Sequence, residues 1–229
     1  NYPETNLVER YFGGIFDRQY YTESGPLVRE LEAAINQAVG ANHVVCVSNP
    51  AVAWLMLLEA ESLAGKNLLV PASVPRPLFE AISWLRCSSQ LYCDDLKSWY
   101  QAPQISSMKT LTKIDAVIGI NRWGGACDID DFLTQAEREN VRVYFDSSES
   151  FACEFNGQPV GSFGKAEVFS FDHENLIYGD NAACICTNDE LLADRLRCMR
   201  SSGGVIRKVP VSKTVNGRMS EAQAAYALM

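Results

Sequence analysis

The stretch HVVCVSNPAVAWLMLLEA, residues 43–60, joins a short valine-rich run to a longer apolar segment through Ser48-Asn49-Pro50. The valine-rich run is typical of a buried strand, and the alanine and leucine residues that follow it favour a helix. A strand that leads directly into a helix is the repeating unit of a sheet whose strands run parallel. The stretch therefore predicts a βα unit.

The same alternation of strands and helices continues along the chain. Strands are predicted at 43–47, 67–71, 89–93, 115–120, 141–145, 167–171 and 183–187. Helices are predicted at 26–40, 51–65, 129–140 and 188–204. In the first of these helices, Pro26 suits the first turn and Gly40 suits the end. We therefore predict an α/β protein with three layers, in which helices cover both faces of a mostly parallel sheet.

Composition and charge exclude several classes of partner. Of the 229 residues, 47% are hydrophobic and 21% are charged, which is typical of a globular protein with a sizeable core. A net charge of -8 would repel a phosphate backbone, so we expect no nucleic acid partner. No apolar run approaches the roughly 20 residues that span a bilayer, and the N-terminal residues lack the layout of a signal peptide. We therefore expect no membrane interaction and a cytoplasmic location.

The cysteines do not form a recognisable framework. They are scattered at Cys46, Cys87, Cys93, Cys127, Cys153, Cys184, Cys186 and Cys198, with no CxxC pair. A chain of this size needs no disulfides for stability, so we expect buried thiols that pack as small hydrophobic side chains. No metal site is predicted.

Residues that directly follow the predicted strands are the first candidates for ligand contacts, because ligands of such sheets collect beyond the carboxyl ends of the strands. This rule selects Ser48-Asn49-Pro50, Asn121-Arg122-Trp123, Asp146 and the stretch SFDHENLIYGDNAA, residues 170–183. The last stretch holds one of the two histidines of the chain and contains no lysine.

Three segments carry a resemblance to a known family. They are FNGQPVGSFGKAEVFSF (155–171), GDNAACICTNDE (179–190) and NGRMSEAQAA (216–225). Their turns, their FSF strand and the final helix resemble the DegT/StrS family of pyridoxal-phosphate-dependent sugar aminotransferases, and the resemblance runs through nearly all of the chain. It implies an aspartate-aminotransferase-like (fold type I) large domain over residues 1–229. It also implies that the small C-terminal domain of the family is absent from this chain.

The resemblance implies a pyridoxal phosphate site at particular residues. Asp146 matches the aspartate that keeps the pyridine nitrogen protonated, and Ser170 matches the serine that contacts the phosphate. Asn49 and Ala51 stand in the phosphate loop, where they flank a proline that has no N–H to offer. Glu149 replaces a neutral amide of the family. These five residues are the cofactor-binding candidates.

Two further family features are altered. Val74 and Pro75 stand where an aromatic residue would stack on the pyridine ring. His173, Glu174 and Asn175 stand where the family has the lysine that holds the cofactor as a Schiff base and moves the proton. A branch of the family uses histidine in place of lysine to dehydrate a keto-sugar, so His173 is the catalytic candidate.

Two functions of different classes remain open on the sequence, and a third possibility is a pocket without cofactor that still binds a sugar nucleotide. The first is a degenerate family member without transaminase activity and without cofactor, which acts as a binding or partner subunit in nucleotide-sugar metabolism. The second is an active pyridoxal phosphate enzyme on a nucleotide-linked keto-sugar, either a dehydratase that uses His173 or an aminotransferase whose lysine comes from elsewhere. The joint loss of the lysine, the phosphate loop and the stacking residue favours the first.

The resemblance also implies partners. Active family members are dimers with sites at the subunit interface, so we expect a homodimer or a heterodimer with an active family member, and a sugar nucleotide as ligand. The matched residues also have purely structural interpretations: Asp146 as the cap of a turn, Ser170 as a core hydroxyl and His173 as a surface histidine.

Overall fold

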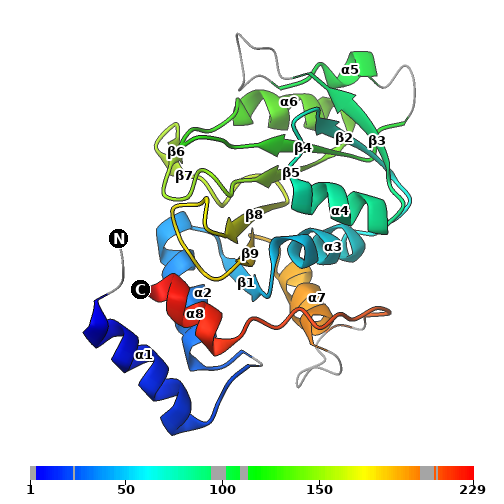
Figure 1. The fold of residues 1–229 in the computed structure, drawn as a ribbon. Helices are drawn as coiled ribbons and strands as arrows, with labels where there is room; N and C mark the ends of the chain where they lie inside the picture. The colour runs from blue at the N-terminus through cyan, green and yellow to red at the C-terminus, as the bar shows by residue number, and fades with distance from the viewer. Residues whose placement is uncertain (1–3, 23, 94–101, 109–112, 202–208, 210) are drawn as a thin grey trace.

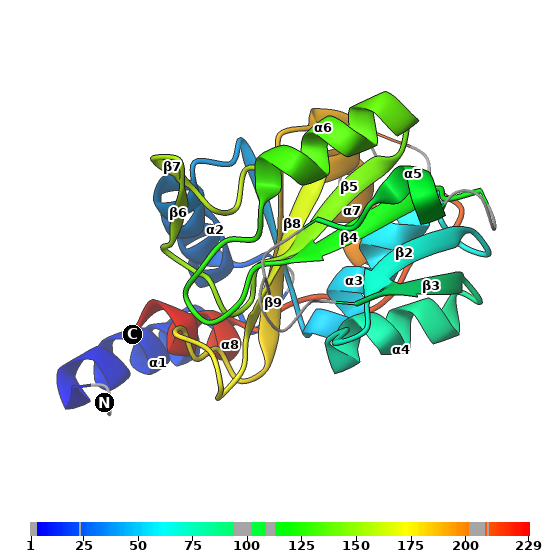
Figure 2. The ribbon, with the colours of Figure 1, turned by 90° about the horizontal axis from the view of Figure 1, so that it is seen from above.

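The computed structural model describes residues 4–22, 24–93, 102–108, 113–201, 209 and 211–229. These residues form a seven-stranded sheet with helices on both faces (Figures 1 and 2). The strands of this sheet are β1 (His43–Val47), β2 (Asn67–Pro71), β3 (Ser88–Tyr92), β4 (Ala116–Ile120), β5 (Arg142–Asp146), β8 (Ala166–Phe171) and β9 (Ala182–Thr187). A hairpin of β6 (Glu154–Phe155) and β7 (Gln158–Pro159) stands apart from it.

The strand order is β1-β9-β8-β5-β4-β2-β3. From β8 to β3 all pairings are parallel, whereas β9 runs antiparallel to both β8 and β1. The predicted mostly parallel α/β sheet is therefore confirmed. Because β4, β5 and β8 are parallel neighbours, their carboxyl ends meet at one edge, where a ligand site is expected.

The helices are α1 (Thr5–Arg18), α2 (Pro26–Val39), α3 (Pro50–Ala60), α4 (Arg76–Trp84), α5 (Ile105–Met108), α6 (Ile129–Glu139), α7 (Glu190–Arg200) and α8 (Glu221–Leu228). The predicted helices correspond to α2, α3, α6 and α7, and α3 ends five residues earlier than predicted. Sequence reasoning missed α4, whose start holds Pro75 and Pro77. Both prolines suit the first turn of a helix, where a missing N–H costs nothing.

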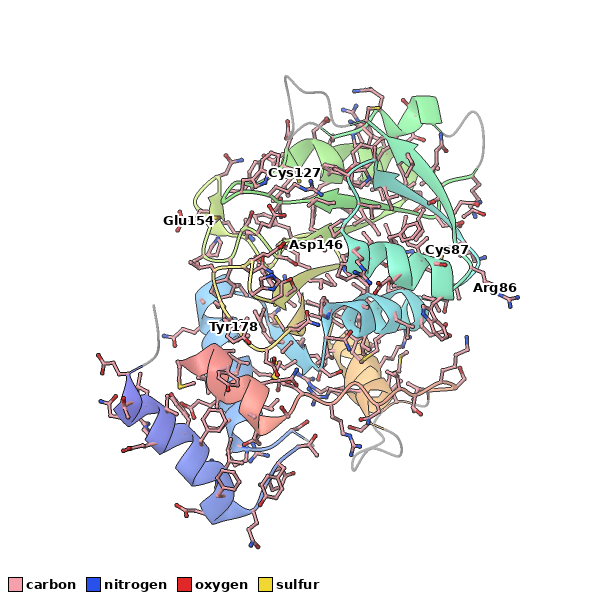
Figure 3. All side chains as sticks on the ribbon, in the orientation of Figure 1. Arg86, Cys87, Cys127, Asp146, Glu154 and Tyr178 are labelled. Carbon is pink, nitrogen blue, oxygen red and sulfur yellow. The ribbon has the colours of Figure 1, made fainter. Side chains whose placement is uncertain are left out.

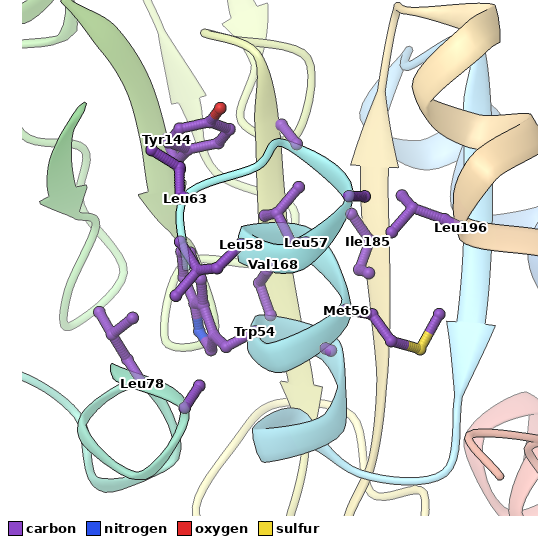
Figure 4. Packing of buried hydrophobic residues seen from close by; sticks show 14 of the residues in the cluster. Trp54, Met56, Leu57, Leu58, Leu63, Leu78, Tyr144, Val168, Ile185 and Leu196 are labelled. Atoms are coloured by element: carbon purple, nitrogen blue, oxygen red, sulfur yellow. The ribbon is translucent and has the colours of Figure 1, made fainter. Parts of the chain in front are cut away.

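One face of the sheet is covered by α3, α4 and α7. Helix α3 is apolar on all sides because it lies between the sheet and its two neighbours, so that Trp54, Met56 and Leu57 are fully buried. Figure 4 shows these side chains packed against Val168 and Ile185 of the sheet. This cluster fixes the α3 N-terminus beside the ends of β5 and β8.

The other face is covered by α2 and α8 over β1, β9 and β8, and by α6 over β5 and β4. Cysteines fill part of this face, and the Sγ atoms of Cys184 and Cys186 lie 3.9 Å apart. All eight cysteines are free thiols, and five of them are buried. The expectation of buried thiols is wrong for Cys93, which is exposed, and incomplete for Cys87 and Cys153, which are partly exposed.

Two features are absent from the residues that the structure describes. None of the helices there has both the length and the apolar character that a membrane crossing requires. In the same part of the chain, no group of three His, Cys, Asp or Glu side chains is arranged to hold a metal ion.

Helix α2 is capped from a distant part of the chain. Its N-cap residue, Gly25, has no side chain to offer, and the carboxylate of Glu221 on α8 takes that role. Glu221 is fully buried, and its two oxygens accept hydrogen bonds from the backbone N–H groups of Leu27 (2.9 Å) and Val28 (3.1 Å). A Cβ atom on Gly25 would lie 2.5 Å from this carboxylate, so the position requires glycine. The NGRMSEAQAA segment thus fixes α8 against α2.

Replacement of Glu221 by alanine should lower the free energy of unfolding by about 2 kcal/mol, because two helix N–H groups lose their acceptor in the core. Urea unfolding followed by circular dichroism measures the change. Glu137→Ala, at an exposed site of α6, is the matched control and should change the value by less than about 0.5 kcal/mol. Equal values for the two variants would contradict the capping role.

Candidate active site

The carboxyl ends of β4, β5 and β8 open into a cleft of about 1130 Å³. Figure 3 labels Asp146 at the end of β5 and Tyr178 on the loop between β8 and β9, both of which line the cleft. Other residues that line the cleft are Pro50, Pro75, Arg76, Asn121, Arg122, Trp123, Glu149, Ser170, Asp172, His173, Glu174, Asn175, Leu176 and Asp180. The sequence rule that selected residues after strand ends therefore identified most of the wall.

Asp146 lies at the floor of the cleft and is 4% exposed. Its Oδ2 accepts a hydrogen bond from Nε1 of Trp54 (3.1 Å), and its Oδ1 accepts one from the backbone N–H of Ser148 (3.1 Å). Burial raises the pKa of Asp146, while these hydrogen bonds and the charge of Arg122 act in the opposite direction. Both carboxylate oxygens thus already have donors from the protein. Sequence reasoning did not identify Trp54 as part of the site.

Ser170 is held by the loop that follows β8. Its hydroxyl donates to Oδ2 of Asp172 (3.2 Å) and accepts from Nδ2 of Asn175 (2.6 Å). The Asn175 amide also donates to Oδ1 of Asp172 (2.9 Å) and to the Ser170 carbonyl (3.1 Å). A phosphate group needs a donor, and the one O–H of Ser170 is already used within this loop. We call Ser170, Asp172 and Asn175 the serine cluster.

His173 lies on the outer side of the cleft. Its side chain is 81% exposed, and Nε2 is 3.7 Å from a carboxylate oxygen of Glu174, which is equally exposed. The structure therefore places His173 in the lining of the cleft with a largely exposed imidazole, whereas the carboxyl group of Asp146 is buried.

Asn49 and Ala51 begin helix α3 at the edge of the cleft. Asn49 is the N-cap, and its side chain accepts a hydrogen bond from the N–H of Val52 (2.9 Å). Pro50 follows as the first helical residue, lines the cleft and has no N–H. A helix start binds phosphate through free N–H groups, and here the cap and the proline remove two of them.

Glu149 has a structural role in the wall. Its Oε2 accepts a hydrogen bond from the backbone N–H of Trp123 (3.2 Å), and its carbonyl accepts one from Gly124 (3.0 Å). On the same turn, a guanidinium nitrogen of Arg122 donates to the carbonyl of Ser73. Glu149 and Arg122 thus connect the ends of β5 and β4 to the loop after β2.

The charges that line the cleft are mostly negative. Two guanidinium groups, of Arg76 and Arg122, face the carboxyl groups of Asp146, Glu149, Asp172, Glu174 and Asp180. Such a lining disfavours a dianionic phosphate group.

These residues do not fit pyridoxal phosphate held as the family holds it. A Schiff base requires a lysine, and none of the described residues that line the cleft is a lysine. The start of α3 presents a proline, the Ser170 hydroxyl is engaged, and Pro75 replaces the expected aromatic face. Of the family features, the buried carboxylate of Asp146 is kept, and its two oxygens already accept hydrogen bonds from the protein.

Comparison with known proteins relates the chain to enzymes of sugar metabolism. The profile of the DegT/DnrJ/EryC1/StrS aminotransferase family matches residues 6–229. A dTDP-3-amino-3,6-dideoxy-alpha-D-galactopyranose transaminase from Aneurinibacillus thermoaerophilus is 28% identical over 220 residues, which cover 95% of this chain and 60% of that protein. The chain thus spans about 60% of the length of this curated relative.

Two solved structures show the same fold. DesI, determined in the presence of its TDP-sugar product, superposes with a TM-score of 0.91 at 26% identity and covers 100% of this chain and 58% of its own. The Escherichia coli GDP-4-keto-6-deoxy-D-mannose-3-dehydratase with bound hydrated PLP superposes with a TM-score of 0.85 at 20% identity, over 100% of this chain and 65% of its own.

Replacement of Trp54 by phenylalanine removes the indole donor of Asp146 and should raise the pKa of this carboxyl further. At pH values above the pKa of Asp146 in the variant, the variant should have lost about 1 to 3 kcal/mol of unfolding free energy. This loss should shrink as the pH falls through that pKa. Volume lost in the core lowers stability at every pH, so the difference between neutral and acidic pH isolates the hydrogen bond. Denaturant unfolding at both pH values measures it.

Trp84→Phe is the control, since the Trp84 side chain is 80% exposed and should tolerate the change at either pH. A Trp54→Phe loss that is the same at both pH values would contradict a bond to the ionised carboxylate.

Proposed function

The chain belongs to the DegT/DnrJ/EryC1/StrS aminotransferase family, and we propose that it is a member without transaminase activity that serves as a binding or partner subunit in nucleotide-sugar metabolism. Relatives that match it are named as dTDP-sugar transaminases and as GDP-perosamine synthases, which supports nucleotide-sugar metabolism as the setting. The geometry of the cleft supports the loss of activity.

The serine cluster is the observation that carries the proposal. In it, the amide of Asn175 and the carboxylate of Asp172 satisfy the hydroxyl of Ser170. No described lysine faces this cluster from the cleft lining. A buried polar group that has its partners within the protein gains little from a ligand that must displace them.

The alternative is an active enzyme on a nucleotide-linked keto-sugar in which His173 moves the proton. It is favoured by the presence of both His173 and Asp146 in the wall of one cleft. Against it, the imidazole is 81% exposed and paired with Glu174, whereas a catalytic base works best at a desolvated position.

The partner in the proposal is an active relative of the same fold, and an exposed aromatic strip provides a surface for it. The strip consists of four exposed aromatic residues, the exposed Leu176 and the partly buried Phe12; the four are Phe16, Tyr21, Tyr178 and Tyr226. The rings of Tyr178 and Tyr226 are 5.8 Å apart, and those of Phe12 and Tyr226 are 5.3 Å apart. It runs from the cleft over α8 to α1, which lies beside α8 in Figure 1. Contiguous apolar surface of this kind marks interaction sites.

The strip also reaches the cleft, because Leu176 and Tyr178 belong to both. They are 76% and 48% exposed in the single chain. A subunit docked on the strip would therefore cover part of the cleft mouth, which connects partner binding to ligand access.

Purified protein incubated with pyridoxal phosphate and then desalted should retain no cofactor absorbance. After borohydride treatment, mass spectrometry should find no stoichiometric phosphopyridoxyl group on any one peptide, because none of the described residues that line the cleft is a lysine. An active transaminase of the family is the positive control. A stoichiometric adduct on one peptide would overturn the proposal, and cofactor retained without an adduct would favour the alternative, in which His173→Ala abolishes keto-sugar turnover.

Substitution of both Leu176 and Tyr178 by serine should weaken association with the partner subunit at least about tenfold, because two apolar anchors leave the interface. Sedimentation velocity and co-purification from the native source measure association. Leu191→Ser, a 62% exposed leucine on α7 outside the strip, should leave it unchanged. A native protein that stays monomeric with no relative attached would count against the partner role.

A further inference from the structure

Glu167 is a buried carboxyl group that the proposed function does not use. It lies in β8 within the run AEVFSF and is 0% exposed. Directly opposite it stand Phe145 on β5 and Cys186 on β9. A carboxyl group in such surroundings must have hydrogen-bond donors, and it becomes protonated more easily than one in water.

The carboxylate of Glu167 accepts hydrogen bonds from three donors. One oxygen accepts from the backbone N–H groups of Gly161 (2.9 Å) and Phe163 (2.7 Å), and the other accepts from the hydroxyl of Ser147. The two backbone N–H groups can only donate, whereas the Ser147 hydroxyl can both donate and accept. The Ser147 side is therefore where a change at Glu167 is transmitted.

From Ser147 the hydrogen bonds continue into the cleft wall. The Ser147 hydroxyl accepts a hydrogen bond from Nδ2 of Asn121 (2.9 Å), and Oδ1 of Asn121 accepts one from the backbone N–H of Cys127 (2.9 Å). Asn121 itself lines the cleft. From here on, the name cleft wall is kept for residues 121–127, which follow β4 and include Arg122 and Trp123. Glu167 thus connects the core of the sheet to the cleft wall through two side chains.

We propose that Glu167 is a pH-dependent switch that holds the cleft wall in place when it is ionised and releases it when it is protonated. The protonated carboxyl must donate its hydrogen, and the Ser147 oxygen is the acceptor within reach. The hydrogen of Ser147 then has no acceptor, because Asn121 already donates to the same oxygen. If the Asn121 amide turns over to accept it, Nδ2 of Asn121 takes the place of Oδ1, which now accepts from the backbone N–H of Cys127. In the first arrangement the buried Ser147 hydroxyl lacks an acceptor, and in the second the hydrogen bond between Asn121 and Cys127 is lost.

The described side chains that face Glu167 carry no charge that would fix its protonation state, so this state depends on the pH. The side chains that face it on the neighbouring strands are the Cys186 thiol and the Phe145 ring, and α2 contributes Val39 beneath the turn. Lys165, two residues earlier, is exposed. Burial raises the pKa of Glu167 to about 7, and the three hydrogen bonds act in the opposite direction. The switch therefore operates near neutral pH.

Ionisation of Glu167 has opposite effects on the overall stability of the protein and on the cleft wall. Because the folded protein holds the proton more tightly than the unfolded chain, this group lowers overall stability as the pH rises toward about 7. The cleft wall, in contrast, becomes better held over the same range. A measurement confined to residues 121–127 is therefore needed, and it requires no ligand, so its outcome is independent of the proposed function.

Hydrogen exchange of peptides that cover residues 121–127, followed by mass spectrometry, tests the switch. Glu167→Gln imitates the protonated side chain at every pH. At about pH 8.5 the wild-type wall should exchange about tenfold more slowly than that of the variant, and at about pH 5.5 the two should be equal. Comparison at the same pH cancels the intrinsic exchange rate.

Glu154→Gln, at an exposed site, is the control and should match the wild type at both pH values. Ser147→Ala breaks the connection by another route and should match Glu167→Gln, and it replaces that variant if Glu167→Gln fails to fold. Equal exchange of wild type and Glu167→Gln at about pH 8.5, or the same difference at both pH values, would overturn the proposal.

Discussion

A buried carboxylate must have hydrogen-bond donors, and this requirement organises the protein. Asp146 obtains a donor from Trp54 on α3, Glu221 from the first turn of α2, and Glu167 from Ser147. Each bond joins segments that are far apart in the sequence or on different strands. Together they fix α3, α2 with α8, and the ends of β4, β5 and β8, which are the elements that shape the cleft.

Under the proposed function, the same requirement explains how a cleft of this fold can persist in a member without transaminase activity. Asp146 and Ser170 both lie in the lining of the cleft. The hydrogen-bond partner of Asp146 is Trp54, and those of Ser170 are Asp172 and Asn175. On this account the two residues are retained because the protein needs them internally. The open volume and the aromatic strip remain for a ligand and a second subunit.

Much of the fold could be predicted from the sequence, because its strands are short apolar runs and α2, α3, α6 and α7 follow helical periodicity. Helix α4 could not, since the prolines of PASVPRP resemble a loop until the first turn is seen. The Trp54 to Asp146 bond joins residues 92 positions apart, which no local pattern reveals. The role of Asn175 depends on how one loop turns back on Ser170. The buried position of Glu167 could not be predicted, because nothing in the apolar strand around it indicates the donors that it meets.

The most direct test of this account is a crystal structure of the native protein grown with pyridoxal phosphate and solved at a resolution that shows side-chain amides. The account predicts that Asn175 remains hydrogen-bonded to Ser170 and Asp172, and that no electron density joins a cofactor to a side chain of the cleft. Continuous density from a lysine to the cofactor, with Asn175 displaced from Ser170, would contradict it.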